Sequence, residues 1–201
     1  MELLLIRHGL PLRVENPDGT PADPPLASEG RAQAERLAHV LAAEPLGAVV
    51  ASPLRRARET AEPILERVGG HLEILPGVAE FDARSASYVP LDEIKRRNPE
   101  RWRELVAGEL FAGVDVEGFR RTVIDSLEDL ARRHRGLERV AVFCHGGVIN
   151  VYAAFVLGLD RPFFFEPGYT SVSRFLVAGT GERSLLSLNE TGHLRRGGNR
   201  A

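Results

Sequence analysis

Two histidines follow apolar runs whose length is typical of buried strands. His8 lies two residues after the run Leu3–Ile6, His145 lies two residues after Val140–Phe143, and each is followed directly by glycine. In an open α/β sheet, ligands bind beyond the carboxyl ends of the strands. An imidazole there can act as a nucleophile or move a proton, and glycine lets a ligand approach the backbone closely. A lone histidine at a strand end is more often structural, but two in the same setting predict a site.

Cationic groups accompany these histidines. Arg7 directly precedes the first of them. Arg55 and Arg56 fall in the first turn of a helix that is predicted to start at Ser52-Pro53. Another helix, beginning near Gly147, would aim its free backbone amides and the positive end of its dipole at the same point. Guanidinium groups and a helix N-terminus around imidazoles are typical of a phosphate site.

Strands and helices alternate along most of the chain. Further strands are predicted around Val49-Val50, Leu72–Leu75, Ser171–Val177 and Ser184–Leu188. Apolar residues at helical spacing predict helices from Ser28 to about Ala43, from Ser52 onward and after Asp115, with Ser28, Ser52 and Asp115 as caps. The alternation predicts an α/β fold, a three-layer α/β/α sandwich with a mostly parallel central sheet.

The segment 81–114 interrupts the alternation and is predicted to be a small cap inserted into a single domain of residues 1–201. Short helices are expected within it at Leu91–Arg97 and Pro99–Ala107. The aromatic residues Tyr88, Trp102 and Phe111 either line the mouth of the site or form a small core of the cap. The segment also contains a basic run that comprises Lys95, Arg96, Arg97, Arg101 and Arg103. This run either forms a solvated helix face or binds a second acidic group of the substrate.

The composition of the chain narrows the class of function. The 201 residues carry 28 acidic and 26 basic side chains, for a net charge of −2, and 43% of them are hydrophobic. These values exclude disorder or a coiled coil for the whole chain and argue against binding nucleic acid or a membrane through bulk charge. All basic residues except Lys95 are arginine, which we interpret mainly as background composition. An anion must therefore be bound in a local pocket.

The cysteine content and the apolar segments predict a cytoplasmic protein. Cys144 is the one cysteine, which excludes an intramolecular disulfide, fits a reducing cytosol and is expected to be a buried thiol. Val140–Leu159 carries no charged residue and could in principle span a bilayer. Its histidine, glycines and asparagine favour a buried strand followed by a packed helix.

An ordered set of segments resembles the histidine phosphatase superfamily, branch 1, which is also called phosphoglycerate-mutase-like. The segments are Leu5–Gly9, Leu26–Ala34, Ala51–Ala61, Glu80–Asp82, Val142–Ile149 and Leu188–Leu194. The Arg-His-Gly triplet alone is weak support for a resemblance, but the ordered set extends over nearly the whole chain.

The resemblance implies a role for individual residues. His8 would be the nucleophile and form a phosphohistidine. The phosphoryl oxygens would be bound by Arg7, Arg56, His145 and the backbone at Gly9 and Gly146. Glu80 would be the acid and base, with Asp82 as the alternative. Because cationic groups neutralise the phosphoryl charge, the resemblance implies no metal and no cofactor.

The sequence departs from the family pattern in the loops around this centre. Leu10 stands where a polar residue is common, Ala27 replaces a common threonine, and the one nearby asparagine, Asn16, comes two residues late. Ala83–Ala86 follows the acidic segment in place of a glycine-rich stretch. We therefore expect altered substrate contacts around an intact transfer centre.

Three functions are compatible with these residues. The first is a metal-independent phosphatase acting on a small phosphorylated metabolite. The second is a phosphoglycerate-mutase-type phosphotransferase, which would use the same residues but usually has a longer cap and tail, so the length favours hydrolysis. The third is a non-catalytic phosphate-binding module. No nucleic acid or membrane partner is expected; a homodimer stays open, because the run Phe163–Phe165 is either an interface edge or core.

Overall fold

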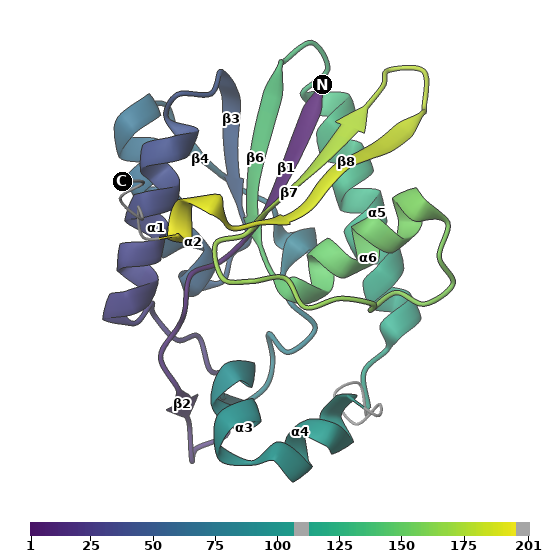
Figure 1. Ribbon diagram of the computed structural model, residues 1–201. Helices are drawn as coiled ribbons and strands as arrows, with labels where there is room; N and C mark the ends of the chain where they lie inside the picture. The colour runs from purple at the N-terminus through teal and green to yellow at the C-terminus, as the bar shows by residue number, and fades with distance from the viewer. Residues whose placement is uncertain (107–112, 196–201) are drawn as a thin grey trace, which may run out of the picture.

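The computed structural model describes residues 1–106 and 113–195 (Figure 1). Its centre is a six-stranded sheet with the strands in the order β4 (Leu72–Ile74), β3 (Leu46–Ala51), β6 (Arg139–Cys144), β1 (Glu2–Arg7), β7 (Val172–Val177) and β8 (Arg183–Glu190). The first four strands in this order are parallel to one another, and β7 is antiparallel to both of its neighbours. The carboxyl ends of the four parallel strands therefore meet at one edge of the sheet.

Helices cover both faces of the sheet, as predicted. α1 (Ser28–Leu41) and α2 (Arg55–Val68) lie on one face, and α5 (Val116–Arg133) and α6 (Gly146–Leu157) lie on the other (Figure 1). Successive strand residues point to opposite faces. In β1, Leu4 and Ile6 pack toward α1 and α2, whereas Leu3 and Leu5 pack toward α5 and α6. The wholly apolar sequence of β1 thus follows from its burial on two sides, and the three-layer α/β/α prediction is confirmed.

Two of the three predicted helix caps differ from the structure. Ser28 is the first residue of α1 and Ala27 occupies the cap position, without a side-chain bond. α2 begins at Arg55, three residues after Ser52, and the amide of Arg55 donates to the carboxylate of Asp23. The Ser52 hydroxyl instead bonds a histidine ring in the site described below. Asp115 caps α5 as predicted, by accepting from the amide of Gly118.

The cap lies beyond the carboxyl ends of the parallel strands (Figure 1). It contains α3 (Leu91–Arg97) and α4 (Pro99–Val106), so both helices predicted there are present. A short strand, β5 (Ser87–Tyr88), pairs with β2 (Val14–Glu15) and ties the cap to the loop after β1. Short 3-10 turns lie at Pro76–Val78 and Gly192–Leu194. Residues 107–112 of the predicted cap, including Ala107 and Phe111, lie outside the described residues.

The uncharged segment Val140–Leu159 forms most of β6 and all of α6. Cys144 ends the strand and is fully buried in the core shared with α5 and α6. In the two described ranges, no helix has the length and apolar character needed to cross a membrane.

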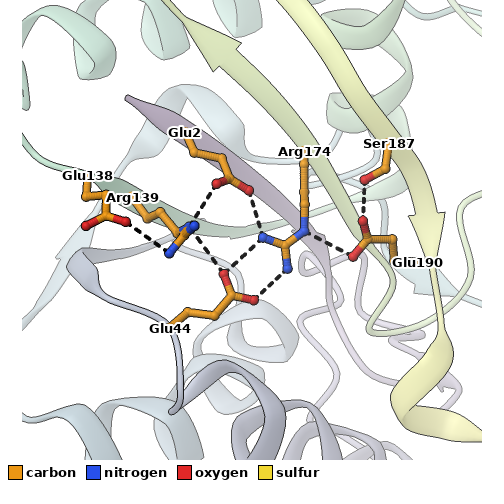
Figure 2. Close-up of polar contacts among 7 residues, drawn as sticks. All are labelled: Glu2, Glu44, Glu138, Arg139, Arg174, Ser187 and Glu190. Atoms are coloured by element: carbon orange, nitrogen blue, oxygen red, sulfur yellow. Dashed lines mark hydrogen bonds and ion pairs between the residues drawn. The ribbon is translucent and has the colours of Figure 1, made fainter.

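A network of ion pairs joins four strands on the side of the sheet that carries α1 (Figure 2). Arg174 of β7 lies 2.7 Å from Glu2 of β1, 2.6 Å from Glu44 after α1 and 3.0 Å from Glu190 of β8. Arg139 of β6 lies 2.8 Å from the other carboxylate oxygen of Glu2. Burial opposes ionisation of Glu2, but hydrogen bonds from Arg174 and Arg139 outweigh it and lower its pKa. Arg174 therefore holds together three carboxylates that would otherwise repel one another.

We predict that Arg174→Ala lowers the free energy of unfolding by about 2 kcal/mol at neutral pH, because it leaves partly buried carboxylates without their shared cation. Urea denaturation measures this change. The pKa of Glu2 is lower in the folded protein than in the unfolded chain. The ion pairs of Glu2 therefore stabilise the fold fully above the ordinary pKa of a glutamate, and this stabilisation disappears as the pH falls through the pKa of folded Glu2. The loss caused by Arg174→Ala should therefore shrink in acid.

The matched control is Arg121→Ala on the exposed side of α5. We expect it to change the free energy of unfolding by less than about 0.5 kcal/mol. An equal effect of the two substitutions would show that the network contributes nothing specific.

Candidate active site

The two histidines predicted to form a site lie against each other at the carboxyl ends of β1 and β6. The ring centroids of His8 and His145 are 5.2 Å apart. His8 is 3% exposed and His145 is fully buried. The backbone amide of His8 donates to the carbonyl of Cys144 at 3.0 Å, so the two strand ends are bonded directly to each other. The topology of the sheet thus brings together residues that are far apart in the sequence.

His8 is held in one tautomer. Its Nδ1 lies 2.8 Å from the carbonyl oxygen of Gly9. Because a carbonyl oxygen only accepts, Nδ1 carries the hydrogen and the neutral ring has its lone pair on Nε2. Burial lowers the pKa of His8 well below its usual value, and the positive charges of Arg56 and Arg7 lower it further. His8 therefore presents an unprotonated Nε2 at neutral pH.

His145 has the complementary arrangement. Its Nε2 lies 2.8 Å from the hydroxyl of Ser52, which also accepts from the amide of Leu54 at 3.2 Å. The hydroxyl hydrogen is satisfied when Ser52 donates to Nε2, which leaves the ring hydrogen on Nδ1. That Nδ1 is buried and has no partner among the described residues. Burial, followed by the charge of Arg56, lowers the pKa of His145, so the ring is a neutral donor.

Arg7 is buried at the end of β1. It donates to the carbonyl of Pro167, and its Cζ lies 4.1 Å from the ring centroid of Tyr169. A guanidinium over an aromatic face is stabilised by the ring quadrupole. Its Nε is buried without a partner among the described residues. Because a buried charge is costly unless it is paired, this unsatisfied group is suited to an anion.

Arg56 is the second buried guanidinium, with 1% exposure, in the first turn of α2. It donates to Asp82 at 3.2 Å, and its Cζ lies 4.6 Å from the ring centroid of Tyr88 in the cap. Its Nε also lacks a partner in the described part of the chain. The neighbouring Arg55 is half exposed and bonds Glu59 at 2.6 Å. The structure therefore directs Arg56 into the site and Arg55 out of it.

The two glycines expected to contact a ligand differ in their surroundings. The amide of Gly9 donates to the hydroxyl of Thr60 at 2.9 Å, and its carbonyl accepts from His8. Both polar groups of Gly9 are therefore engaged, and it positions His8 rather than facing a ligand. Gly146 begins α6, and a Cβ placed there would meet only the Nε of Arg7, at 3.9 Å. The N-terminus of α6 at Gly146 is thus open to an anion beside Arg7.

Glu80 is anchored to the start of α6. One carboxylate oxygen accepts from the amide of Gly147 at 2.9 Å, and the other accepts from Phe81 at 3.2 Å. A Cβ on residue 147 would lie 2.2 Å from the Glu80 carboxylate, so only glycine permits this contact. Burial, together with the charge of Asp82, raises the pKa of Glu80 to about 7 despite both amide bonds. Glu80 can therefore exist protonated or ionised near neutral pH.

Asp82 has a different partner. It lies 3.2 Å from Arg56, and its side chain is 32% exposed. Burial raises its pKa, whereas Arg56 opposes that shift. Both carboxyls line the same cavity, but Glu80 is attached to the helix that follows His145 and Asp82 to the guanidinium. This division favours Glu80 as the carboxyl that exchanges protons.

A cavity of about 650 Å³ lies over these groups. Tyr88 and Trp102 line the cavity, which agrees with the interpretation that the aromatic residues of the cap line the mouth of the site. Phe111 lies outside the described residues. Among the described residues, none of the cationic side chains of the basic run Lys95–Arg103 lines this cavity. Lys95 pairs with Glu166 at 3.4 Å. The solvated-face interpretation therefore fits the run.

Sequence reasoning missed several residues that hold the site. The sequence predicts Ser52 as a helix cap, but its hydroxyl bonds His145, and it lies inside a motif segment. Thr60 of the same segment bonds Gly9 and the carbonyl of Arg56. Tyr169 lies in a loop with no recognisable pattern, and only the fold places its ring beside Arg7. The first two could have been found from the motif, but Tyr169 could not.

Several known proteins are similar to this chain. A phosphoserine phosphatase 1 of Hydrogenobacter thermophilus is 30% identical over 96% of this chain and 94% of its own length. The structure of a phosphoserine phosphatase mutant of Entamoeba histolytica with phosphoserine has a TM-score of 0.72 at 22% identity, over 96% of this chain and 99% of that chain. The alpha-ribazole phosphatase of Shigella flexneri has a TM-score of 0.71 at 22% identity, over 94% and 96%.

The match to a family model extends over nearly the whole chain. It covers residues 3–191 and therefore includes the ends of β1 and β6, the start of α2 and the cap. The solved structures named above share this fold over 94% or more of the chain. The chain belongs to the histidine phosphatase superfamily, branch 1.

Proposed function

We propose that this protein is a phosphatase that hydrolyses small phosphomonoesters through a phosphohistidine on His8 and needs no metal. The observation that carries the proposal is the hydrogen bond from Nδ1 of His8 to the carbonyl of Gly9, which leaves Nε2 as a nucleophile. Buried Nε atoms of Arg7 and Arg56 and the Nδ1 of His145 supply donors for phosphoryl oxygens. The phosphatase names of the relatives support the same reaction class.

In the first step, the lone pair on Nε2 of His8 attacks phosphorus while the bond from phosphorus to the ester oxygen breaks. Protonated Glu80 gives its proton to the departing oxygen, so the alcohol leaves neutral. Arg7, Arg56 and the Nδ1 hydrogen of His145 stabilise the charge spread over the phosphoryl oxygens. Positioning and charge neutralisation are the main requirements of this transfer, and the cationic site meets them.

In the second step, a water attacks the phosphohistidine and the phosphorus–nitrogen bond breaks. The Glu80 carboxylate takes the proton of that water, which regenerates the acid. Inorganic phosphate leaves, and His8 returns to its neutral tautomer. The pKa of about 7 suits Glu80 to both roles, because each protonation state is accessible near neutral pH.

We further propose that the substrate is a small phosphorylated metabolite and that the protein works in the cytoplasm, where its buried thiol Cys144 would stay reduced. From the composition we also expect no nucleic acid or membrane partner. The sequence is compatible with either a monomer or a homodimer.

We predict that His8→Ala lowers phosphate release from p-nitrophenyl phosphate, measured with EDTA present, on the order of a thousandfold, because the variant has no nucleophile. An undiminished rate would exclude the proposed mechanism.

Phosphorus NMR of the unsubstituted protein with 3-phosphoglycerate separates hydrolysis from the mutase alternative. We expect free phosphate, and accumulation of the 2-phospho isomer would instead show a phosphotransferase.

We predict that Glu80→Gln slows an alkyl phosphate about a hundredfold, because no proton reaches the leaving oxygen. It should slow p-nitrophenyl phosphate much less, since nitrophenolate leaves without a proton. In the unsubstituted protein, kcat for the alkyl ester should fall as the pH rises through about 7, where Glu80 loses its proton, and Glu80→Gln should remove this decline.

The matched control is Asp82→Asn, which changes the other carboxyl of the cavity. We expect it to affect both classes of ester alike, through Arg56. If Asp82→Asn instead removes the leaving-group dependence and the alkaline decline, Asp82 is the proton donor.

We predict that Ser52→Ala lowers kcat about tenfold, because the Nδ1 hydrogen of His145 is no longer fixed toward the phosphoryl oxygens. Nitrogen NMR of His145 should show the ring hydrogen on Nδ1 in the unsubstituted protein and a mixture of tautomers in the variant. Ser52→Thr keeps the hydroxyl and should restore both properties. An unchanged tautomer together with a lower rate would assign Ser52 a purely structural role.

A further inference from the structure

We infer that the preferred substrate is a phosphomonoester of an alcohol that carries a bulky apolar group such as an aromatic ring. This inference rests on the proposed phosphatase activity and concerns the part of the cavity beyond the phosphate-binding groups. With about 650 Å³, the cavity falls within the roughly 300–1,000 Å³ of sites that enclose drug-sized ligands. A phosphoryl group with a short polar alcohol would leave much of it unfilled.

The lining beyond the strand ends is mainly apolar and comes from two separate segments. The cap contributes Val89, Leu91, Ile94, Trp102 and Leu105, and the segment after α6 contributes Phe163, Phe164, Phe165 and Pro167. Phe81 lies beside Glu80, which is the proposed proton donor to the leaving oxygen. The group attached to that oxygen therefore enters an aromatic and aliphatic surrounding.

Two polar side chains of this lining, those of Asn150 and Ser85, already have protein partners. The Asn150 amide donates to the carbonyls of Gly146 and Phe165, and its oxygen accepts from the amides of Phe164 and Phe165. The Ser85 hydroxyl donates to the carbonyl of Ser87 and accepts from its amide. An additional charged group in the substrate would lose water without gaining a free partner from these residues.

The charged groups of the lining point to the same conclusion. Asp82 is paired with Arg56, and Glu166 is paired with Lys95. Arg161 has no ion-pair partner among the described residues but is exposed, so a carboxylate bound there would stay in water. Such an exposed ion pair contributes little to binding, because water screens it. The ammonium and carboxylate of an amino-acid phosphate therefore gain little here.

Burial of an apolar leaving group gains more. Removing apolar carbon from water is favourable roughly in proportion to the area buried, and an aromatic ring buries several carbon atoms at once. Aromatic side chains also offer ring faces and edges for stacking. The binding energy of the apolar group is realised in the transition state as well as in the bound substrate, so it raises kcat/KM.

The test compares kcat/KM for benzyl phosphate, ethyl phosphate and phosphoserine, measured as phosphate release. All three are esters of primary alcohols and need a proton at the leaving oxygen, so they differ mainly in what fills the cavity. We expect benzyl phosphate to exceed each of the others by at least about tenfold. Equal values, or a preference for phosphoserine, would overturn the inference while leaving the phosphatase activity intact. If none of the three esters is hydrolysed, the proposed function itself is refuted.

A matched pair of variants tests whether the cavity is responsible. Ile94→Ser places a hydroxyl in the lining, and Leu186→Ser changes an apolar residue of β8 that is 51% exposed and outside the lining. We expect Ile94→Ser to lower kcat/KM about fivefold for benzyl phosphate and to leave ethyl phosphate nearly unchanged. Leu186→Ser should change neither.

A second lining variant guards against a local loss of structure. Trp102→Ala should reduce the same preference, since it removes another apolar side chain from the cavity. Equal losses for benzyl and ethyl phosphate in both Ile94→Ser and Trp102→Ala would show that the cavity does not select the leaving group, and the inference would fail.

Discussion

The burial of two guanidinium groups at the ends of parallel strands is the constraint on which the site depends. Arg7 and Arg56 are 7% and 1% exposed, and a charge removed from water must be compensated. Tyrosine rings, a carbonyl and one carboxylate compensate part of it, yet the Nε of each arginine remains unsatisfied among the described residues. The folded protein is therefore prepared for a bound anion. Burial, reinforced by the same charges, lowers the pKa of both histidines, which suits His8 to the proposed role of nucleophile and His145 to that of hydrogen-bond donor.

The two ends of the sheet handle charge differently. In the network around Arg174, each guanidinium is matched by several carboxylates, and that network joins strands. At the carboxyl ends of the parallel strands, positive groups exceed their protein partners. A protein with a net charge of −2 can therefore bind phosphate, because its cationic groups converge locally. The cap contributes Tyr88 to Arg56 and most of the apolar lining, so it acts on both phosphate binding and leaving-group selection.

Much of the fold could be predicted because its rules are local. The apolar run of β1 follows from burial on two faces, and the capping aspartate of α5 bonds within one turn. The start of α2 could not be predicted, since the Ser52 hydroxyl serves a histidine 93 positions away. The basic run of the cap remained ambiguous for a similar reason. Whether a cation faces a cavity or an acidic neighbour depends on which segments pack beside it.

The sequence by itself determined the α/β class, the order of the motif segments and the residue types available at the strand ends, because strand periodicity and helix spacing are local properties. Only the tertiary structure decided which atoms carry hydrogens and which groups are engaged. It placed Nδ1 of His8 against a carbonyl and Nε2 of His145 against a hydroxyl, committed Gly9 to internal bonds, and separated Glu80 on a helix amide from Asp82 on a guanidinium. Tautomers and pKa values depend on neighbours through space, and packing alone sets those distances.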